Sequence, residues 1–475
     1  MLVIIALDIL VVGGLLAIAF HKGTERTLPF LAFCLLLLPQ EAVIQLPGLF
    51  DLTPNRLAII TFFILSIILG TRSSPALGES RVPLIYLMIL QLFWYSVATA
   101  NSPVFAVSLK ATISQALDFF LLYYIVAKTV STTDTIHKLL TAVFMAMSIC
   151  SVLAYFEAYH GWTVMQYLPI RLHRFGEGGN LLVDAARGTR ARATFPHAIL
   201  LGSALSMAIP IGFYLLTLAK SQWRKIVLWA GLLLMFMAIY RSMSRGPWIA
   251  LILSLVVMFL FLEGETRKRM MYVALLTVAV LVIRPGVWDV IKNTYVATLA
   301  PGSMQYDSYQ WRYTLLELAK ETVGKSVDRQ LWGYGPESFF YLNLMAEYEG
   351  RMVPAETCDS SIAALIIETG YLGLLFTSLV MIMAAVTVLR DFRALPKPYD
   401  QLSLMLFVNI MAFCFMMTNV AIYGWGQQNY ILWIMVALGV VYPRLVQAQD
   451  GAPAGEMDRQ LAGLPPPLYE AFTDR

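Results

Sequence analysis

The chain has 475 residues, of which 59% are hydrophobic and only 13% are charged, and its formal net charge at pH 7 is +4. Together with a mean hydropathy of +0.68, this composition excludes a soluble globular domain. The apolar runs are long and continuous, whereas a membrane β-barrel has alternating segments of about ten residues. The sequence therefore predicts an all-α fold, a polytopic integral membrane helical bundle.

About thirteen hydrophobic segments are candidates for transmembrane helices. In chain order they cover residues 2–20, 28–46, 57–70, 82–100, 112–129, 136–158, 196–219, 226–242, 247–263, 270–283, 361–389, 402–423 and 429–446. They divide the chain into amino-terminal helices (1–158), a first loop (159–195), further helices (196–283), a large loop (284–360), carboxy-terminal helices (361–446) and a tail (447–475). We expect short helices in the large loop and a disordered cytoplasmic tail.

Basic residues in the short loops predict the orientation, because Lys and Arg accumulate on the cytoplasmic side. One alternating set of loops is strongly basic and includes Lys22, Arg26, Lys128, Lys138, Lys220, Arg224, Lys225, Arg267, Lys268, Arg269, Arg390, Arg393 and Lys397. The other set holds little beyond Arg56, Lys110, Arg241 and Arg245. We therefore expect the N-terminus outside, the C-terminus inside and both long loops on the extracytoplasmic face.

Cysteine and histidine usage predicts neither a disulfide nor a metal site. Of the four cysteines, Cys358 lies in the large loop and the other three lie in predicted spans, so no external disulfide is expected. The sequence has no CxxC motif and no His-rich cluster. We expect no metal ion, no other cofactor and no nucleic-acid partner.

The first long loop is rich in arginine: Arg171, Arg174, Arg187, Arg190 and Arg192. Positive charge on the predicted outer face indicates an anionic partner, although long loops also cross the membrane whatever their charge. Arg190 and Arg192 stand just before Pro196, which suits the start of a helix, so an anion could be held there. We interpret the adjacent His197 as a packed or interfacial side chain in preference to a catalytic one.

A short charged break, Arg-Ser-Met-Ser-Arg-Gly-Pro-Trp over residues 241–248, separates two predicted spans on the outer side. Charged residues at membrane depth usually line a cavity or pair with a partner. Arg245 is therefore a candidate for substrate binding. An interfacial anchor, with Trp248 in the aromatic belt, explains the pattern nearly as well.

Two patterns in and beside the large loop complete the set. The first begins with Tyr-Gln-Trp-Arg-Tyr at residues 309–313 and predicts an amphipathic helix that lies on the membrane. It leads to a glycine-rich turn at residues 331–339, Leu-Trp-Gly-Tyr-Gly-Pro-Glu-Ser-Phe. The second runs from Cys358 to Gly373 and contains Asp359 and Ser360, either of which can cap the next helix. Capping is a sufficient structural explanation for Asp359.

Taken together and in this order, the patterns resemble the O-antigen ligase and polymerase superfamily of bacterial envelope glycan assembly. The resemblance covers about residues 190–375 and runs through Arg and Thr-Phe, Ser-Arg-Gly, Trp-Arg, Gly-Tyr-Gly-Pro-Glu-Ser-Phe, Asp-Ser-Ser-Ile and Glu-Thr-Gly-Tyr-Leu-Gly-Leu. It implies a multi-pass protein of the bacterial cytoplasmic (inner) membrane with its active site on the extracytoplasmic face.

The resemblance further implies an inverting, metal-independent glycosyltransferase that moves a glycan from undecaprenyl diphosphate to an acceptor hydroxyl in O-antigen or exopolysaccharide assembly. Its partners would be the lipid-linked oligosaccharide donor, a glycan or lipid acceptor, the bilayer and other polysaccharide-assembly membrane proteins. Arg192, with Arg190 beside it, and Arg312 would hold the diphosphate, because the guanidinium fork fits phosphate oxygens. The turn with Gly333 and Gly335 would shape the acceptor side.

One departure from the family pattern concerns the base. Similar ligases place a histidine where this chain has Asp359, which could accept the acceptor's proton if its pKa were raised, or orient the acceptor by its charge. Glu337 and Glu356 are the alternative bases. The substitution favours a polymerase over a ligase. It also leaves open a non-catalytic component of a polysaccharide export system; a transporter or flippase is disfavoured because few ionisable residues lie within the spans.

Overall fold

The computed structural model describes residues 2–43, 51–70, 82–168, 181–184, 188–264, 267–272, 275 and 285–450. Within these ranges, eight helices are long and apolar enough to cross a membrane, and three shorter apolar helices accompany them. The protein is a multi-pass membrane protein, and the predicted helical bundle is confirmed. Arg171, Arg174, Arg187 and the tail beyond Asp450 lie outside the described residues.

The amino-terminal half of the bundle is built from consecutive helices. They are α1 (Leu2–Lys22), α2 (Thr24–Leu37), α3 (Pro54–Ile68), α4 (Ile85–Ala100), α5 (Phe105–Gln115), the π-helix η1 (Ala116–Leu121), α6 (Leu122–Thr129) and α7 (Thr133–His160). The 3-10 turn η2 (Val164–Tyr167) and the antiparallel strands β1 (Leu182–Asp184) and β2 (Gly188–Arg190) follow in the first loop. Helices α5, η1 and α6 form one continuous run, as the predicted span 112–129 requires.

The remaining helices frame the large loop. The bundle continues with α8 (Ala198–Leu218), α9 (Gln222–Arg241) and α10 (Arg245–Phe261), and it ends with α15 (Ser361–Ala394), α16 (Asp400–Asn419) and α17 (Gln428–Asp450). Between them lie α12 (Pro285–Leu299), α13 (Met304–Gly324), α14 (Val327–Trp332), η3 (Ser338–Tyr341), β3 (Met345–Tyr348) and β4 (Arg351–Pro354). Twelve of the thirteen predicted segments overlap a helix or a helical run, and the segment 270–283 lies largely outside the described residues.

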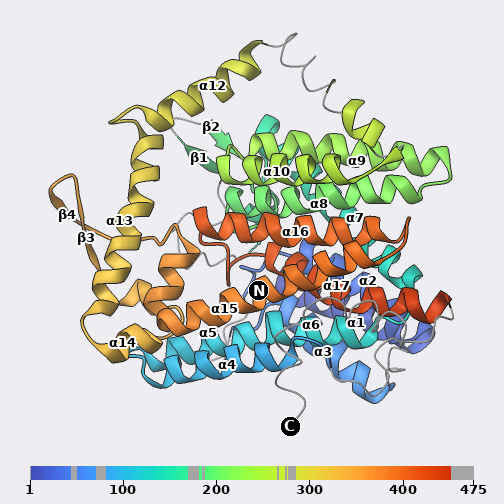
Figure 1. Ribbon diagram of the computed structural model, residues 1–475, viewed down its shortest axis with the longest axis horizontal. Coiled ribbons are helices and arrows are strands. Elements are labelled where there is room, and N and C mark those ends of the chain that lie inside the picture. The colour runs from blue at the N-terminus through green and yellow to red at the C-terminus, as the bar shows by residue number, and fades with distance from the viewer. Residues whose placement is uncertain are drawn as a thin grey trace.

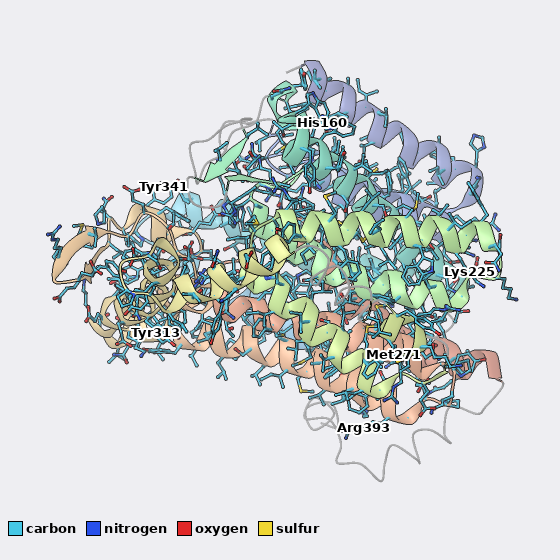
Figure 2. The ribbon with its side chains drawn as sticks, turned by 90° about the horizontal axis from the view of Figure 1, so that it is seen from above. His160, Lys225, Met271, Tyr313, Tyr341 and Arg393 are labelled. Atoms are coloured by element: carbon cyan, nitrogen blue, oxygen red, sulfur yellow. The ribbon has the colours of Figure 1, made fainter. Side chains whose placement is uncertain are left out.

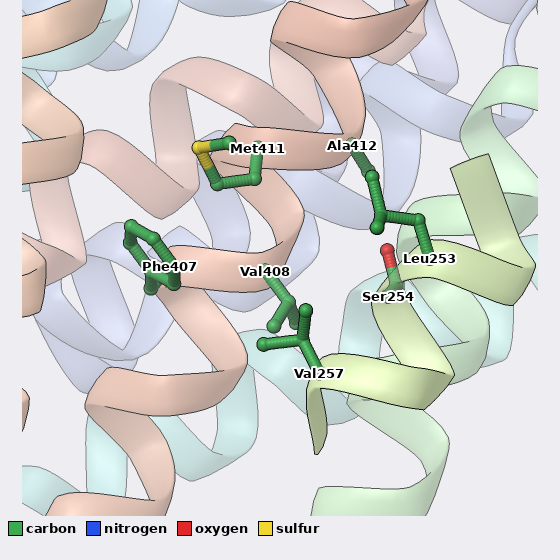
Figure 3. Close-up of a pocket in the computed structure, with 7 residues that line it drawn as sticks. All are labelled: Leu253, Ser254, Val257, Phe407, Val408, Met411 and Ala412. Carbon is green, nitrogen blue, oxygen red and sulfur yellow. The ribbon is translucent and has the colours of Figure 1, made fainter. Parts of the chain in front are cut away.

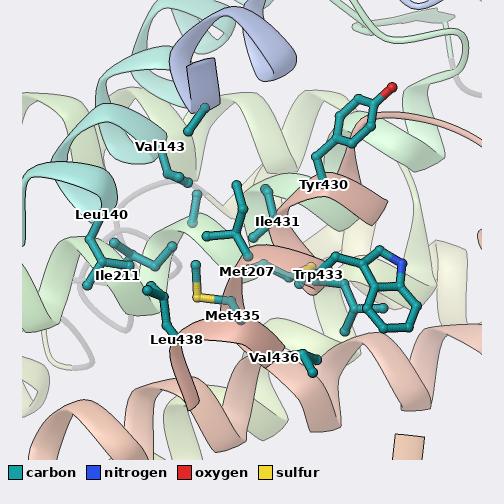
Figure 4. Close-up of a cluster of buried hydrophobic side chains, with 14 of the residues drawn as sticks. Leu140, Val143, Met207, Ile211, Tyr430, Ile431, Trp433, Met435, Val436 and Leu438 are labelled. Atoms are coloured by element: carbon teal, nitrogen blue, oxygen red, sulfur yellow. The ribbon is translucent and has the colours of Figure 1, made fainter. Parts of the chain in front are cut away.

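Two helices form the centre of the bundle. The most apolar window of α8 is 94% buried and that of α17 is 83% buried, whereas the value for α1 is 28%. Figure 4 shows this core, where α7, α8 and α17 contribute Leu140, Val143, Met207, Ile211, Ile431, Trp433, Met435 and Leu438. Peripheral helices keep exposed apolar side chains such as Ile9 and Ile252, which is expected of surfaces that contact lipid tails.

The large loop forms a small structure of its own at one end of the bundle. In Figure 1 the bundle helices run roughly side by side, α13 crosses them at one end, and α14 and the β3–β4 hairpin lie beside it. We call this end, defined by α13, α14 and the hairpin, the loop end. Figure 2 shows Tyr313 and Tyr341 at the loop end and Lys225 at the opposite end, the separation that the charge pattern predicts. Which end faces the cytoplasm stays a prediction.

Helix α13 is attached to the loop end by its apolar face. Leu315, Ala319 and Val323 are fully buried, and they pack in one cluster with Phe339 and Ile366. This packing accounts for the amphipathic pattern that we had assigned to a helix lying on the membrane. The two hairpins were not predicted, because strands of three or four residues are too short to show an alternating pattern.

Candidate functional site

The end of the first loop is shaped by the start of α8. The helix begins at Ala198, two residues after Pro196, and His197 is its N-cap residue: Nδ1 of His197 accepts a hydrogen bond of 3.2 Å from the amide of Ile199. The imidazole ring also lies 6.2 Å from the Trp425 ring, centroid to centroid. In these contacts His197 caps a helix and packs against an aromatic ring.

A buried carboxylate, Glu157 near the end of α7, fixes the backbone on which Arg192 sits. Its Oε2 accepts hydrogen bonds of 2.7 Å from the amides of both Arg192 and Ala193, and its Oε1 accepts one of 2.6 Å from Thr163. The Arg192 side chain is only 1% exposed, and its Nη1 donates to the carbonyl of Pro196 at 3.5 Å. Arg192 is thus built into the wall of the site, where its charge acts on Glu157.

Arg190, the last residue of β2, is held by the break between α9 and α10. Its Nε donates to the carbonyl of Ser242 at 3.2 Å, and its Nη2 donates to Oγ of Ser244 at 2.9 Å. The hydroxyl of Ser244 in turn donates to the carbonyl of Ser242 at 2.9 Å. Arg190 and Ser242 are 52 residues apart in the sequence and are in direct contact in the structure. The two serines of the break orient the Arg190 guanidinium.

The arginines of the break itself have structural contacts. Arg241 donates from Nη2 to the carbonyl of Thr189 at 3.3 Å, which ties α9 to strand β2. Arg245, the first residue of α10, donates from Nη1 to the hydroxyl of Thr298 and so connects α10 to α12. Trp248 stacks on a tyrosine of α9, with ring centroids 6.0 Å apart. The break is a junction between four elements, and Arg245 stays a candidate for substrate binding.

Arg312 and Asp359 come from different parts of the large loop. Arg312 lies in α13 and donates from Nη1 to the carbonyl of Ser308, one turn earlier in the same helix, at 3.0 Å. Asp359 lies just before α15, and the N-cap residue of that helix is Ser360, whose Oγ accepts a bond of 3.4 Å from the amide of Ala363. The capping role that could have explained Asp359 belongs to its neighbour.

The charges of three distant segments meet at Asp359. Burial raises the pKa of this carboxyl above its ordinary value of 3.8, and the positive charges of Arg312 and Arg190 oppose that shift without cancelling it. The end of the first loop, the helix α13 and the start of α15 are thus brought together electrostatically. Of the arginines predicted at the end of the first loop, Arg190 is the one whose charge acts on Asp359.

The glycine-rich turn is a backbone contact with α15. The amide of Gly335 donates to the carbonyl of Glu368 at 2.7 Å, and the amide of Tyr334 donates to the carbonyl of Ile367 at 2.8 Å. A Cβ on Gly333, which has a φ of +69°, would stand 2.6 Å from the Ile367 oxygen. On the other side, Gly370 has a φ of +68° and interrupts α15. These glycines allow the two chains to touch, so their observed contacts are structural.

The two alternative bases lie in different surroundings. Glu356 is exposed, in the connection between β4 and α15. Glu337 is half-buried with a left-handed φ of 58°, and its charge acts on Arg56. Arg56 forms an ion pair of 3.0 Å with Asp118 of η1, in which both side chains are nearly inaccessible. The sequence places Arg56 among the few basic residues of the outer loops and does not indicate its partner, because only the fold brings α3 against η1.

The connection between α16 and α17 joins the two sides of the site. Ser361, beside Asp359, donates from Oγ to the carbonyl of Val420 at 2.7 Å and accepts from the amide of Ile422 at 3.0 Å. Seven residues after Val420, Gln427 donates from Nε2 to the carbonyl of Thr194, at the end of the first loop, at 2.9 Å. This connection fixes the start of α15 relative to the first loop.

An apolar hollow lies between α10 and α16, and its lining includes the exposed side chains of Leu253 and Met411. It is lined by Leu253, Ser254, Val257, Phe407, Val408, Met411 and Ala412 (Figure 3). The hydroxyl of Ser254 donates to the carbonyl of Ala250 at 2.9 Å, so its polar group is satisfied within the helix. The hollow therefore offers an apolar surface on the helix that begins at Arg245.

A comparison with known protein families finds a match within the chain. Residues 230–378, from α9 to the first half of α15, match the family described as O-antigen ligase. This segment is an O-antigen ligase family domain. The resemblance predicted from the sequence is thereby confirmed for these residues. The domain contains Arg245, Arg312 and Asp359, whereas Arg190 and Arg192 precede it. A search of curated proteins finds no match.

Proposed function

We propose that the protein is a membrane glycosyltransferase of the O-antigen ligase and polymerase type. It transfers a glycan from undecaprenyl diphosphate to an acceptor hydroxyl during O-antigen or exopolysaccharide assembly. The observation that carries the proposal is that the positive charges of Arg190 and Arg312, which come from distant segments, both act on the carboxyl of Asp359. The O-antigen ligase family domain supports the class of reaction.

The reaction is a single displacement. The acceptor oxygen forms a bond to the anomeric carbon of the donor sugar, and the bond from that carbon to the diphosphate oxygen breaks on the opposite side, which inverts the configuration. The diphosphate leaves with the electron pair, so negative charge grows on its oxygens. Arg190 and Arg312 stabilise this charge, because guanidinium groups that are already in place need no reorganisation during the step.

Asp359 takes the proton of the acceptor hydroxyl. A carboxyl with an ordinary pKa of 3.8 is a weak base, and the burial that raises the pKa of Asp359 makes the carboxylate a better one. Its negative charge also attracts the hydroxyl hydrogen and so orients the acceptor. Arg192 acts through the backbone: with Glu157 it holds the end of the first loop, which positions Arg190.

The bilayer presents the donor. In this proposal the loop end faces the extracytoplasmic side, and the polyprenyl tail lies along α10 and in the apolar hollow. Leu253 is eight residues from Arg245, which places the hollow about 12 Å below the start of α10 at a helical rise of about 1.5 Å per residue. The acceptor, a glycan or a glycolipid, approaches from the side of the hairpin, where other assembly proteins can deliver it.

Deletion of the gene tests the proposal and separates its two forms. Lipid-linked glycans and surface polysaccharide are analysed by gel and mass spectrometry. We expect single repeat units on the lipid and loss of long chains, the polymerase result, because aspartate replaces the histidine of similar ligases. Long lipid-linked chains with a bare acceptor would indicate a ligase. Unchanged glycans would contradict transferase activity and favour a non-catalytic component of an export system.

A further inference from the structure

Two tyrosines form an exposed pair of rings on α13. Tyr309 and Tyr313 are 41% and 55% exposed and lie one helical turn apart. Their ring centroids are 5.2 Å apart at an interplanar angle of 77°, and their hydroxyls are 2.9 Å apart, within hydrogen-bonding distance. Each ring therefore restricts the other, and together they present a preorganised aromatic surface at the loop end.

This surface faces water. Glu317 and Lys320 continue the same face of α13 at helical spacing, and they form an exposed ion pair of 2.8 Å with side chains 64% and 49% exposed. A helix face that carries a solvated ion pair is not embedded in lipid. The opposite face, with Leu315 and Ala319, is buried in the loop end. Large aromatic rings that remain exposed to water commonly mark a binding surface.

The pair is continuous with the proposed site. Arg312 lies between the two tyrosines in the sequence, at the edge of the helix where the exposed face meets the buried one. Its charge acts on Asp359. A ligand whose diphosphate is held by Arg312 would therefore have the groups next to that diphosphate within reach of the Tyr309 ring, about one helical turn away.

We infer that Tyr309 and Tyr313 form a docking surface for the sugars of the lipid-linked donor that lie nearest the diphosphate. This inference rests on the proposed function. The axial C–H groups of a sugar ring carry partial positive charge and pack against the negative face of an aromatic ring. The two phenol hydroxyls add donors and acceptors for sugar hydroxyls. The surface thus recognises a carbohydrate and leaves the lipid and the diphosphate to other residues.

Binding of two lipids separates these contributions. The probes are undecaprenyl diphosphate without sugar and the glycan-bearing lipid diphosphate extracted from the host bacterium, each titrated against the full-length protein in detergent. In the double variant Tyr309→Ala/Tyr313→Ala, we expect affinity for the glycan-bearing lipid to fall about tenfold, as the loss of two aromatic contacts predicts. Affinity for the bare lipid diphosphate should not change.

Two control variants make the result specific. Tyr309→Phe/Tyr313→Phe keeps the two rings and should keep most of the affinity for the glycan-bearing lipid. Tyr341→Ala removes a ring on η3 that is 53% exposed, and this variant should bind both lipids as the wild type does. An alanine pair that binds the glycan-bearing lipid normally, or that loses both lipids equally, overturns the inference. Equal loss would indicate a contact with the polyprenyl diphosphate that the two lipids share. Arg312→Ala with unchanged binding of the bare lipid would instead contradict the proposed diphosphate role.

Discussion

Arg312 has a central place in the proposed chemistry. Its Nη1 donates to the carbonyl of Ser308, one turn earlier in its own helix. We expect Arg312→Ala to lower transfer by about 100-fold or more, because removal of one preorganised donor to a developing anion has an effect of that size. Glycan profiles of the complemented deletion strain measure the loss.

The control for this variant is Arg351→Ala, which removes an exposed arginine of the hairpin in the same loop. It should restore wild-type glycans. The melting temperature of both variants in detergent is measured alongside, so that a loss of transfer is distinguished from a loss of folding. Normal glycans from the Arg312 variant would remove that residue from the site.

Substitutions of Arg190 and of Arg192 are expected to have different effects, one on transfer and the other on stability. Arg192→Ala should lower the free energy of unfolding by about 3 kcal/mol, since it removes the charge beside buried Glu157. Arg190→Lys keeps a charge but loses the fork that binds Ser242 and Ser244, so it should lower transfer with a smaller change in stability. Thermal melting and glycan profiles of both variants measure the two effects. The reverse pattern would return the diphosphate role to Arg192.

Choosing between these two arginines was beyond the sequence. Both precede the same helix, and the choice depends on Glu157, which lies more than 30 residues earlier and accepts hydrogen bonds from the backbone of Arg192. Arg312 and Asp359 were predicted from a family pattern, and the fold brings their charges together. Local patterns indicate which residue types are present, whereas contacts between distant segments decide which of them share a site.

Asp359 links activity to pH in a direction that can be worked out. Because burial raises the pKa of this carboxyl, its ionised form is disfavoured in the folded protein. The ionised carboxylate therefore lowers the stability of the protein at a pH above that raised pKa. Asp359→Asn should therefore abolish transfer and keep or raise the melting temperature at neutral pH. In the wild type, transfer should fall as pH falls through a value above 3.8.

The measurement is a pH series of transfer rates with purified protein, together with melting curves of the variant. Glu347→Gln, an exposed carboxyl on the hairpin, is the matched control and should leave both quantities unchanged. A fully active Asp359→Asn variant would move the base elsewhere, and Glu337 would be the next residue to substitute.

At the scale of elements, α15 is the part on which the site depends most. It begins beside Asp359, is tied at Ser361 to the connection before α17, and is interrupted at Gly370 where the glycine-rich turn docks. Hydropathy predicted this span well, because its apolar run is long. The interruption could not be predicted, since it results from the approach of residues 331–335, which belong to the large loop.

Gly370→Ala should disrupt that contact. A Cβ at this position would collide with the carbonyl of Leu331, which is backbone and cannot rotate away, and the φ of +68° adds strain. We expect a lower melting temperature and loss of transfer. The control is Gly350→Ala in the hairpin turn, where φ is +74° but no atom lies within 4 Å of the new Cβ. Equal effects of the two substitutions would mean that backbone strain alone matters.

At the scale of the whole molecule, the bundle separates two surfaces that the sequence assigned to opposite sides of the membrane. Lys225 belongs to the basic loops and lies at the end opposite Tyr313 and Tyr341 (Figure 2). Such a separation is expected of helices that all cross one bilayer, because each loop must emerge at one end or the other. The excess of Lys and Arg assigns the end with Lys225 to the cytoplasm.

Cysteine labelling in intact cells checks this assignment. The native cysteines give little background, because Cys34, Cys150 and Cys358 are buried and Cys414 is half-buried. A membrane-impermeant maleimide should label Arg351→Cys, in the exposed hairpin, and should label Lys225→Cys only after the membrane is permeabilised. The opposite pattern would place the loop end in the cytoplasm. The arginines and Asp359 would then face the cytoplasm, where an acceptor on the outer surface could not reach them, so extracytoplasmic transfer would be excluded.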